Sequence, residues 1–189
     1  MNLDANNITT AYTSLVQKGA IQENDPSVHT KITLMIGKAQ NNLKMAKTAF
    51  KMSTQQEIKT SLALNPKDSF FDWVIQASYY SMFHAANALL ATKKIKIFRM
   101  DTHKAALYAF GKHFILTKEL EEELFVIYSE TEEQALALFS SLAEEKEKRG
   151  FSAYERLSKM NEQPARESLK HAEEFVKKIG DILRKNNYL

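Results

Sequence analysis

The chain has 189 residues, of which 44% are hydrophobic, and its formal net charge at neutral pH is +3. This length is enough for one domain with a sizeable core. The chain contains no cysteine, which excludes a disulfide framework, a thiol nucleophile and thiolate metal sites. Five glycines and three prolines are few for a β protein, so the composition favours helices. The net charge is too small to indicate nucleic-acid binding by itself.

The first part of the chain predicts a short leading helix. Ile8, Tyr12 and Leu15 recur at helical spacing. The first ten residues lack the basic and apolar regions of a signal peptide, so we expect a cytoplasmic protein. We assign residues 1–24 to an N-terminal helical extension and residues 25–189 to a single bundle domain.

The next segment predicts a long amphipathic helix. Asp25 and Pro26 form a helix start, because Asp is a favourable N-cap and Pro fits the first helical position. Residues 52–68 are mixed and polar and contain the breaker Asn65-Pro66, so we expect a connection with at most a short helical turn. Between these points, apolar residues follow at steps of three and four: Val28, Ile32, Met35, Ala39, Leu43, Ala46 and Phe50.

Residues 70–90, FFDWVIQASYYSMFHAANALL, predict the central helix of the fold. Ser69 and Asp72 form a capping box at its start, and Asp72 is its single formal charge. Apolar side chains fall on every face, and a helix of this kind is enclosed by other helices. It is not a membrane span, because too many polar groups would lie in hydrocarbon. These groups are Asp72, Gln76, Ser78, Ser81, His84 and Asn87.

The segment after the central helix is the most basic in the chain. We regard its five cations as candidate ligands for RNA or nucleotide phosphates, although a run of charges is more often a solvated face. His103 lies in the same segment, beside the start of the next predicted helix, and is a better placed ionisable residue than His84, although capping and loop packing explain it equally well. The five cations are Lys93, Lys94, Lys96, Arg99 and Lys104.

The rest of the chain predicts further helices. Residues 102–114 form a fourth helix, and residues 117–149 form a long fifth helix that Thr117 caps. Residues 151–159 form a short amphipathic segment, and residues 164–183 form the last helix. Short connections between long amphipathic helices imply an all-α antiparallel bundle of about five to seven helices.

Three runs of the sequence resemble the HEPN domain family in its small stand-alone prokaryotic form. They are ASYYSMFHAANALL (residues 77–90), THKAALYAFGKHFI (residues 102–115) and HAEEFVKKIGDIL (residues 171–183), and the resemblance covers roughly residues 30–183. It implies a helical bundle that forms a homodimer and often works beside a small nucleotidyltransferase as a toxin and antitoxin pair. It implies no metal or other cofactor.

The resemblance also implies a candidate catalytic site. Many members of the family are metal-independent ribonucleases that pair an Arg with a His four to six residues later, near the end of a long helix. Arg149 matches the Arg, but no His follows in that window. The segment resembles instead an Arg, Tyr and acid arrangement, with Tyr154 and Glu155. A phenol with a pKa of about 10 is a poor base at neutral pH. The candidate catalytic residues are therefore Arg149, Tyr154 and His103.

Two functions remain open at this point. The first is a non-catalytic homodimeric module that binds a partner protein, a nucleotide or RNA near Arg149 and the basic segment. The alternative is a ribonuclease whose base is His103 or His84. Each candidate also has a structural explanation: Arg149 suits a helix C-terminus, Tyr154 suits a packed aromatic, and His84 suits the core. The missing His favours the first function.

Overall fold

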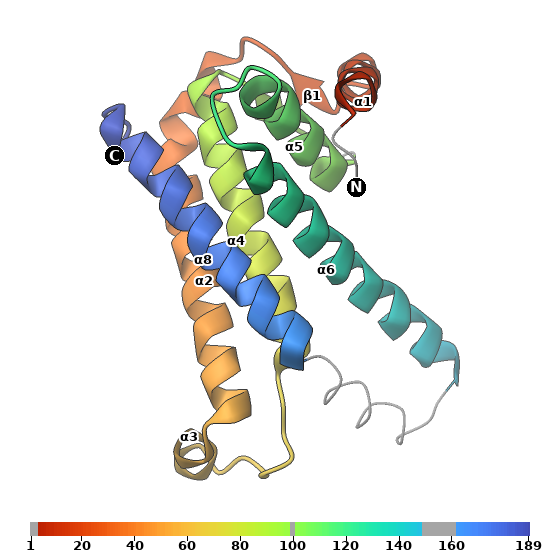
Figure 1. The fold of residues 1–189 in the computed structure, drawn as a ribbon, viewed down its shortest axis with the longest axis vertical. Coiled ribbons are helices and arrows are strands. Elements are labelled where there is room, and N and C mark those ends of the chain that lie inside the picture. The colour runs from red at the N-terminus through yellow and green to blue at the C-terminus, as the bar shows by residue number, and fades with distance from the viewer. Residues whose placement is uncertain (1–3, 99–100, 149–161) are drawn as a thin grey trace.

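The computed structural model of the chain describes residues 4–98, 101–148 and 162–189, the side chains of residues 139–148 excepted. Its long helices are α2 (Ile32–Thr54), α4 (Phe71–Thr92), α6 (Glu122–Lys148) and α8 (Glu162–Lys185). Figure 1 shows α4 and α8 running in the direction opposite to α2, with α6 crossing obliquely. The predicted all-α bundle is confirmed.

Smaller elements surround one end of this bundle. The elements at this end are α1 (Ala5–Gln17), β1 (Ile21–Gln22), the 3₁₀ helix η1 (Pro26–Lys31), β2 (Lys96–Ile97), α5 (Thr102–Phe110) and the π-helical turn η2 (Gly111–Ile115), whereas α3 (Gln56–Ser61) lies at the opposite end (Figure 1). Strands β1 and β2 pair in antiparallel fashion, with Ile21 opposite Ile97 and Gln22 opposite Lys96, so they join the leading segment to the loop after α4.

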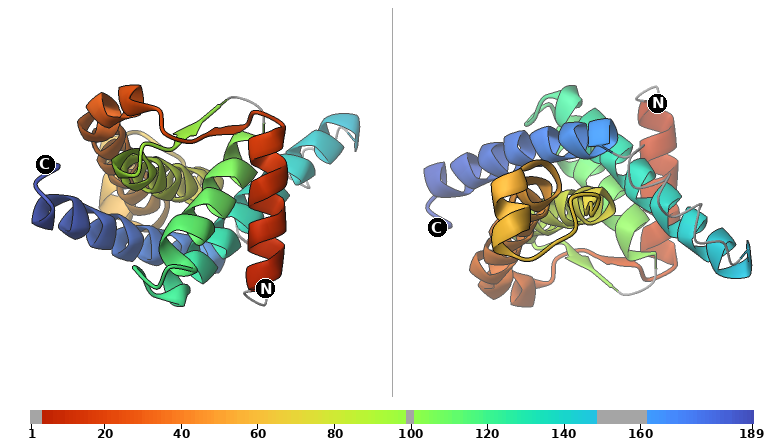
Figure 2. Two further views of the ribbon diagram at one scale, coloured as in Figure 1. Left: turned by 90° about the horizontal axis from the view of Figure 1, so that it is seen from above. Right: turned by 90° about the horizontal axis from the view of Figure 1, so that it is seen from below.

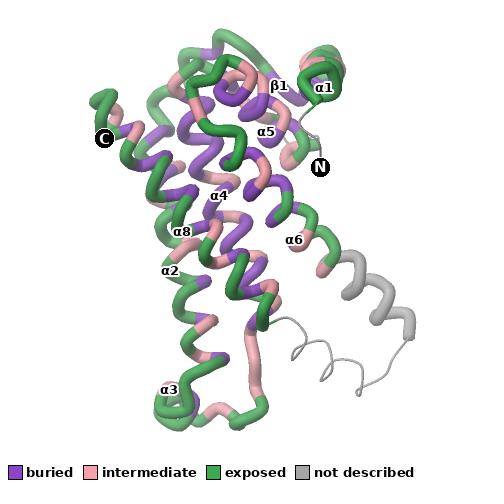
Figure 3. Tube along the Cα trace, in the orientation of Figure 1, coloured by how far each residue is buried: buried purple, intermediate pink, exposed green. Residues whose placement is uncertain are grey.

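Helix α4 is the centre of the fold. It packs against α2, α8, α6 and α5. Figure 2 views the bundle end-on, with α4 between these neighbours, and Figure 3 shows buried residues concentrated along it. Buried positions run from Phe71 to Ala91 and include Val74, Met82 and Leu90, all fully enclosed. The distribution of apolar residues on every face therefore predicted the position of this helix correctly.

The start of α4 differs from the predicted capping box. The helix begins at Phe71, and its N-cap Phe70 makes no side-chain capping bond. The Ser69 hydroxyl is buried without a hydrogen-bond partner in the described part of the chain. The backbone N–H of Phe70 donates instead to the hydroxyl of Ser53, at the end of α2, over 2.7 Å. The first turn of α4 is therefore fixed by a neighbouring helix.

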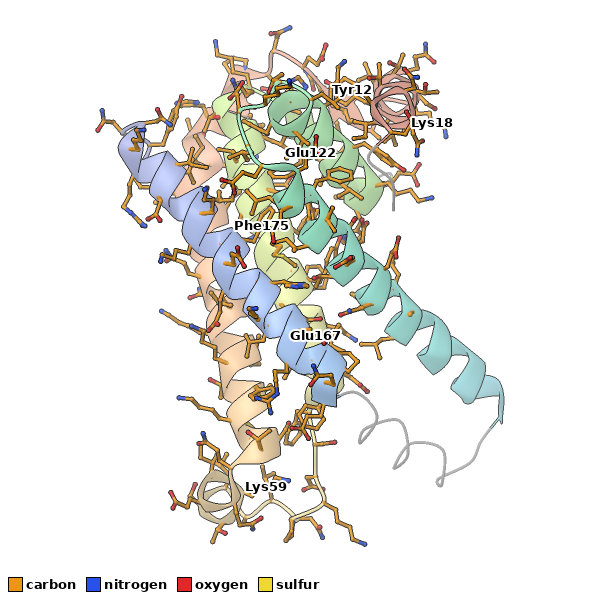
Figure 4. The ribbon with its side chains drawn as sticks, in the orientation of Figure 1. Tyr12, Lys18, Lys59, Glu122, Glu167 and Phe175 are labelled. Carbon is orange, nitrogen blue, oxygen red and sulfur yellow. The ribbon has the colours of Figure 1, made fainter. Side chains whose placement is uncertain are left out.

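The connection between α2 and α4 is held by a buried lysine. Lys59 lies in α3, and its ammonium donates to the carbonyls of Pro66 and Asp68, each over 2.7 Å. Figure 4 places Lys59 at the far end of the bundle from both termini. These bonds satisfy backbone carbonyls that the irregular loop leaves unpaired. The expected short helical turn in this connection is confirmed as α3.

Two further predictions about helix ends have different outcomes. Asp25 caps η1 by accepting from the backbone N–H of Ser27 over 2.9 Å, as its position beside Pro26 predicted. Thr117 does not cap α6, which begins at Glu122. The hydroxyl of Thr117 donates instead to the carbonyl of His113.

Within the described residues, no helix is both long enough and apolar enough to span a bilayer.

Candidate functional site

The structure describes only part of the predicted site. Arg149, Tyr154 and Arg99 lie outside the described residues, so their placement stays a prediction. His103 lies in the first turn of α5. His84 lies in α4, two turns before its end.

Two of the predicted phosphate ligands already have carboxylate partners. Lys93 binds Glu119 with an N–O distance of 2.8 Å, and Lys96 binds Asp25 over the same distance. The hydrogen bond from Lys96 lowers the pKa of Asp25 to about 2. These pairs tie the loop after α4 to η1 and to the segment before α6. Phosphate binding by Lys93 and Lys96 would have to compete with these carboxylates.

The other two described cations are more accessible. Lys94 is exposed in the turn after α4, where its backbone has a φ of +59°. Lys104 is exposed in α5, next to His103, and has no ion pair among the described residues. Burial raises the pKa of Glu132 on α6, and the positive charge of Lys104 partly opposes this rise. Lys104 directly follows the candidate His103 in the chain, so it is the described cation nearest to that residue in sequence.

His103 is held by a tyrosine of the central helix. The hydroxyl of Tyr79 lies 2.5 Å from Nδ1 of His103. Tyr79 is only 2% exposed, and burial raises its pKa well above the ordinary value. Burial also lowers the pKa of His103. The tyrosine therefore keeps its proton, and the imidazole is neutral. The phenol either donates to Nδ1, which leaves Nε2–H as a donor on the other side of the ring, or accepts from Nδ1–H, which leaves Nε2 as an acceptor.

Aromatic rings fix the orientation of this imidazole. The centroid of His103 lies 5.4 Å from that of Tyr79, 6.0 Å from that of Tyr80 and 5.1 Å from that of Phe83. All three rings come from α4, within little more than one helical turn. Contacts on several sides restrict rotation of the ring, so its free nitrogen has a defined direction. Such restriction is what an acid, a base or a binding group requires.

A buried carboxyl group lies near the same tyrosine. Glu132 of α6 is 5% exposed, and its Oε1 has no hydrogen-bond partner in the described residues. Burial, partly offset by Lys104, raises its pKa to about 7. The charge of Glu132 raises the pKa of Tyr79, which places the two groups in one electrostatic environment. A carboxyl group that titrates near neutral pH is typical of functional sites.

A second tyrosine completes this polar centre between α4, α5 and α6. Tyr128 lies one turn before Glu132, and its ring stacks on that of Tyr79 with centroids 6.3 Å apart. Its hydroxyl is fully buried and has no partner among the described residues. Buried polar groups are usually hydrogen-bonded. Tyr128 and Glu132 therefore each contribute a buried polar atom that has no partner among the described residues.

Sequence reasoning identified His103 but missed Tyr79, Tyr128 and Glu132. Glu132 appeared to belong to a surface run of acids, ETEEQ. A signal was nevertheless present, because Leu124, Tyr128 and Glu132 follow at steps of four and so share one face of α6. Since Leu124 and Tyr128 are buried, that face is the one directed to the core.

The other candidate base is less suitable. Burial, with a contribution from Lys38, lowers the pKa of His84 to about 4. Its ring packs against Phe83, with centroids 5.3 Å apart. A group with so low a pKa is a weak base at neutral pH. His103 is therefore the better candidate of the two.

A third histidine, His113, is hydrogen-bonded to the leading helix α1. The hydroxyl of Tyr12 donates to Oε1 of Glu23 over 2.5 Å and accepts from Nε2 of His113 over 2.8 Å. Figure 4 places Tyr12 at the junction of α1 with the α5 end of the bundle. These bonds fasten α1 to η2, which explains the three groups structurally. No group of three or more metal-ligating side chains that could hold a metal occurs in residues 4–98, 101–138 and 162–189.

Comparisons with known proteins give limited similarity. No family model matches the chain, and no solved structure matches it at a significant level. The chain is 43% identical over 61 residues to a protein of Methanocaldococcus jannaschii named "Putative toxin MJ0142". The aligned segment is 32% of this chain and 40% of that protein, so the chain spans about two fifths of the length of the curated relative that it matches.

Proposed function

We propose that this chain is the toxin-type component of a toxin and antitoxin pair, built on a HEPN-like bundle. The observation that carries the proposal is the 43% identity, over 61 residues, to the Methanocaldococcus jannaschii protein whose name is "Putative toxin MJ0142". The three sequence runs that resemble the HEPN family point in the same direction, and the all-α bundle is compatible with it. The family resemblance adds a homodimer and a nucleotidyltransferase partner to the proposal.

The mode of action that we favour is binding of RNA or a nucleotide by a non-catalytic module. When Tyr79 donates to Nδ1, His103 offers Nε2–H as a donor, and exposed Lys104 follows it in the first turn of α5. A hydrogen-bond donor and a cation at a helix N-terminus together favour a phosphate group. The absence of a His after Arg149 in the sequence removes the usual base and supports binding over cleavage.

One observation favours a metal-independent ribonuclease as the second candidate. The hydroxyl of Tyr79 can either donate to Nδ1 of His103 or accept from it. When the hydroxyl accepts from Nδ1–H, Nε2 carries no proton and is free to act as a base. Nε2 would then take the proton of an RNA 2′-hydroxyl while the 2′-oxygen attacks the phosphorus atom. The bond to the 5′-oxygen breaks, and that oxygen takes up a proton, leaving a 2′,3′-cyclic phosphate.

Controlled expression in a bacterial host tests the proposal directly. We expect induction to arrest growth, and we expect His103→Ala and Arg149→Ala to relieve the arrest. Lys170→Ala, an exposed substitution on α8, is the matched control and should remain toxic. Normal growth of cells that accumulate the folded wild-type chain would contradict the toxin assignment.

A cleavage assay on the purified chain separates the two modes. RNA is incubated at low salt with EDTA, and the wild type is compared with His103→Ala. The binding mode predicts no cleavage above a blank preparation, together with RNA retention that weakens in Lys104→Ala. Metal-independent cleavage that disappears in His103→Ala would replace the binding mode by the ribonuclease.

A further inference from the structure

An apolar groove of about 470 Å³ lies between α2 and α4. Two of its side chains are unusually exposed for their type, because Trp73 is 62% and Met45 is 61% exposed. Each helix presents one face to the groove, since the lining residues recur at steps of four and three. They include Met45, Ala49 and Met52 on α2, and Trp73, Ala77 and Tyr80 on α4, and Asn42, Phe70 and Gln76 complete the lining.

The composition of the groove suits apolar side chains of another helix. An exposed tryptophan with neighbouring methionines is typical of protein interfaces, where tryptophan anchors binding and methionine adapts its shape to the partner. Two parallel rows with helical spacing match a helix that inserts residues at positions i, i+4 and i+7. Small Ala49 and Ala77 separate the large side chains of each row and leave room for these insertions.

The charge of α2 defines the rest of the partner, because Lys44 and Lys51 directly precede the lining residues Met45 and Met52, and Lys38 lies one turn before the lining residue Asn42. Helix α2 carries four lysines and no acidic residue. Lys47 pairs with Glu173 over 2.8 Å, whereas Lys38, Lys44 and Lys51 have no ion pair in the described part of the chain. A second copy of this chain, docked α2 against α2, would bring like charges together. Acidic residues flanking the apolar anchors would complement the lysines.

We propose that this groove binds an amphipathic helix of the antitoxin whose apolar face is flanked by acidic residues. The identity of the partner rests on the proposed function, whereas its chemistry follows from the groove. Tyr80 connects the two sites, because it lines the groove and its ring also contacts that of His103 with centroids 6.0 Å apart. A helix bound in the groove would therefore touch a side chain that positions His103.

Trp73 provides the measurement, because it is the single tryptophan of the chain. Two synthetic helical peptides of about 15 residues, long enough to form a stable amphipathic helix when bound, carry the same leucine face and no aromatic residue. One peptide has glutamates beside the leucines, and the other has lysines. We expect the glutamate peptide to shift the Trp73 emission to shorter wavelength with saturation and to bind at least about tenfold more tightly than the lysine peptide. The difference should shrink as salt is raised.

Variants show whether the groove itself is responsible. Met45→Asp should abolish the shift, and circular dichroism verifies that this variant is folded. Exchanging Lys38, Lys44 and Lys51 for glutamate should reverse the preference between the peptides. Lys170→Glu, on α8, makes a charge change of the same kind away from the groove and should leave the preference unchanged.

Several results would overturn the inference. The first is that neither peptide shifts the Trp73 emission, and the second is that both peptides bind with equal affinity. The third is that a single-stranded oligonucleotide displaces the glutamate peptide, which would make the groove an RNA-binding surface. Growth arrest without peptide binding would remove the groove proposal and leave the toxin assignment. Peptide binding by a chain that does not arrest growth would remove the toxin assignment and leave the groove.

Discussion

Replacement of Glu132 by Gln tests whether the centre between α4, α5 and α6 holds a carboxyl group that titrates near neutral pH. Folding raises the pKa of this group from 4.5 to about 7, mainly through burial. Below pH 4.5 the carboxyl is protonated in both the folded and the unfolded chain, so its ionisation has no effect on stability. Between pH 4.5 and pH 7 the unfolded chain ionises this carboxyl while the folded chain keeps it protonated, so the free energy of unfolding falls across this window, and the loss is complete above pH 7.

The magnitude follows from the size of this shift. Two and a half pKa units at 1.36 kcal/mol each correspond to about 3 kcal/mol. Because Gln resembles the protonated carboxyl and cannot ionise, we expect Glu132→Gln to have nearly the wild-type free energy of unfolding at pH 4. At pH 8 we expect it to be more stable than the wild type by about 3 kcal/mol. His103 titrates in both proteins and cancels in the difference.

Urea unfolding at several pH values measures this difference, with the slope of the transition compared between the proteins. Glu130→Gln is the matched control, because Glu130 lies two residues earlier on α6 and is exposed. It should change stability by less than about 0.5 kcal/mol at every pH. A difference for Glu132→Gln that does not grow between pH 4 and pH 8 would refute the reasoning.

Three other substitutions test the packing of the bundle. A Cβ atom on Gly111 would lie 2.7 Å from Cε2 of Phe125, so Gly111→Ala should lower the free energy of unfolding by about 1–3 kcal/mol. Gly37→Ala, where a Cβ meets no atom within 4 Å, should instead raise it by up to about 1 kcal/mol in the same urea assay. Tyr128→Phe removes a buried hydroxyl that has no partner in the described residues, so thermal unfolding should show unchanged or slightly increased stability. A marked loss of stability in Tyr128→Phe would mean that the hydroxyl is bonded.

The sequence predicted the helices well because their patterns are local. Residues 70–90 carry apolar side chains on every face, and this pattern predicted that other helices enclose them. Ile8, Tyr12 and Leu15 of α1 are buried, as their helical spacing predicted. The helix starts were less predictable. Thr117 has the chemistry of a cap, but its hydroxyl bonds to His113 and α6 begins at Glu122.

The candidate site was predictable only in part, because its contacts join residues far apart in the chain. Spacing along one helix says nothing about the 2.5 Å approach of Tyr79 to His103 of another helix. The same is true of Lys93 and Lys96, which the sequence presents as a basic cluster. The fold brings a carboxylate to each of them, from Glu119 and Asp25.

The bond between Ser53 and Phe70 has a consequence for the motions of the central helix. A helix with a cap from its own sequence can fray and re-form its first turn independently of its neighbours. Here the N–H of Phe70 donates to the hydroxyl of Ser53 in α2, so this bond breaks when α4 moves away from α2. Exchange of that amide with solvent deuterium should therefore report the separation of α2 from α4 and not local fraying.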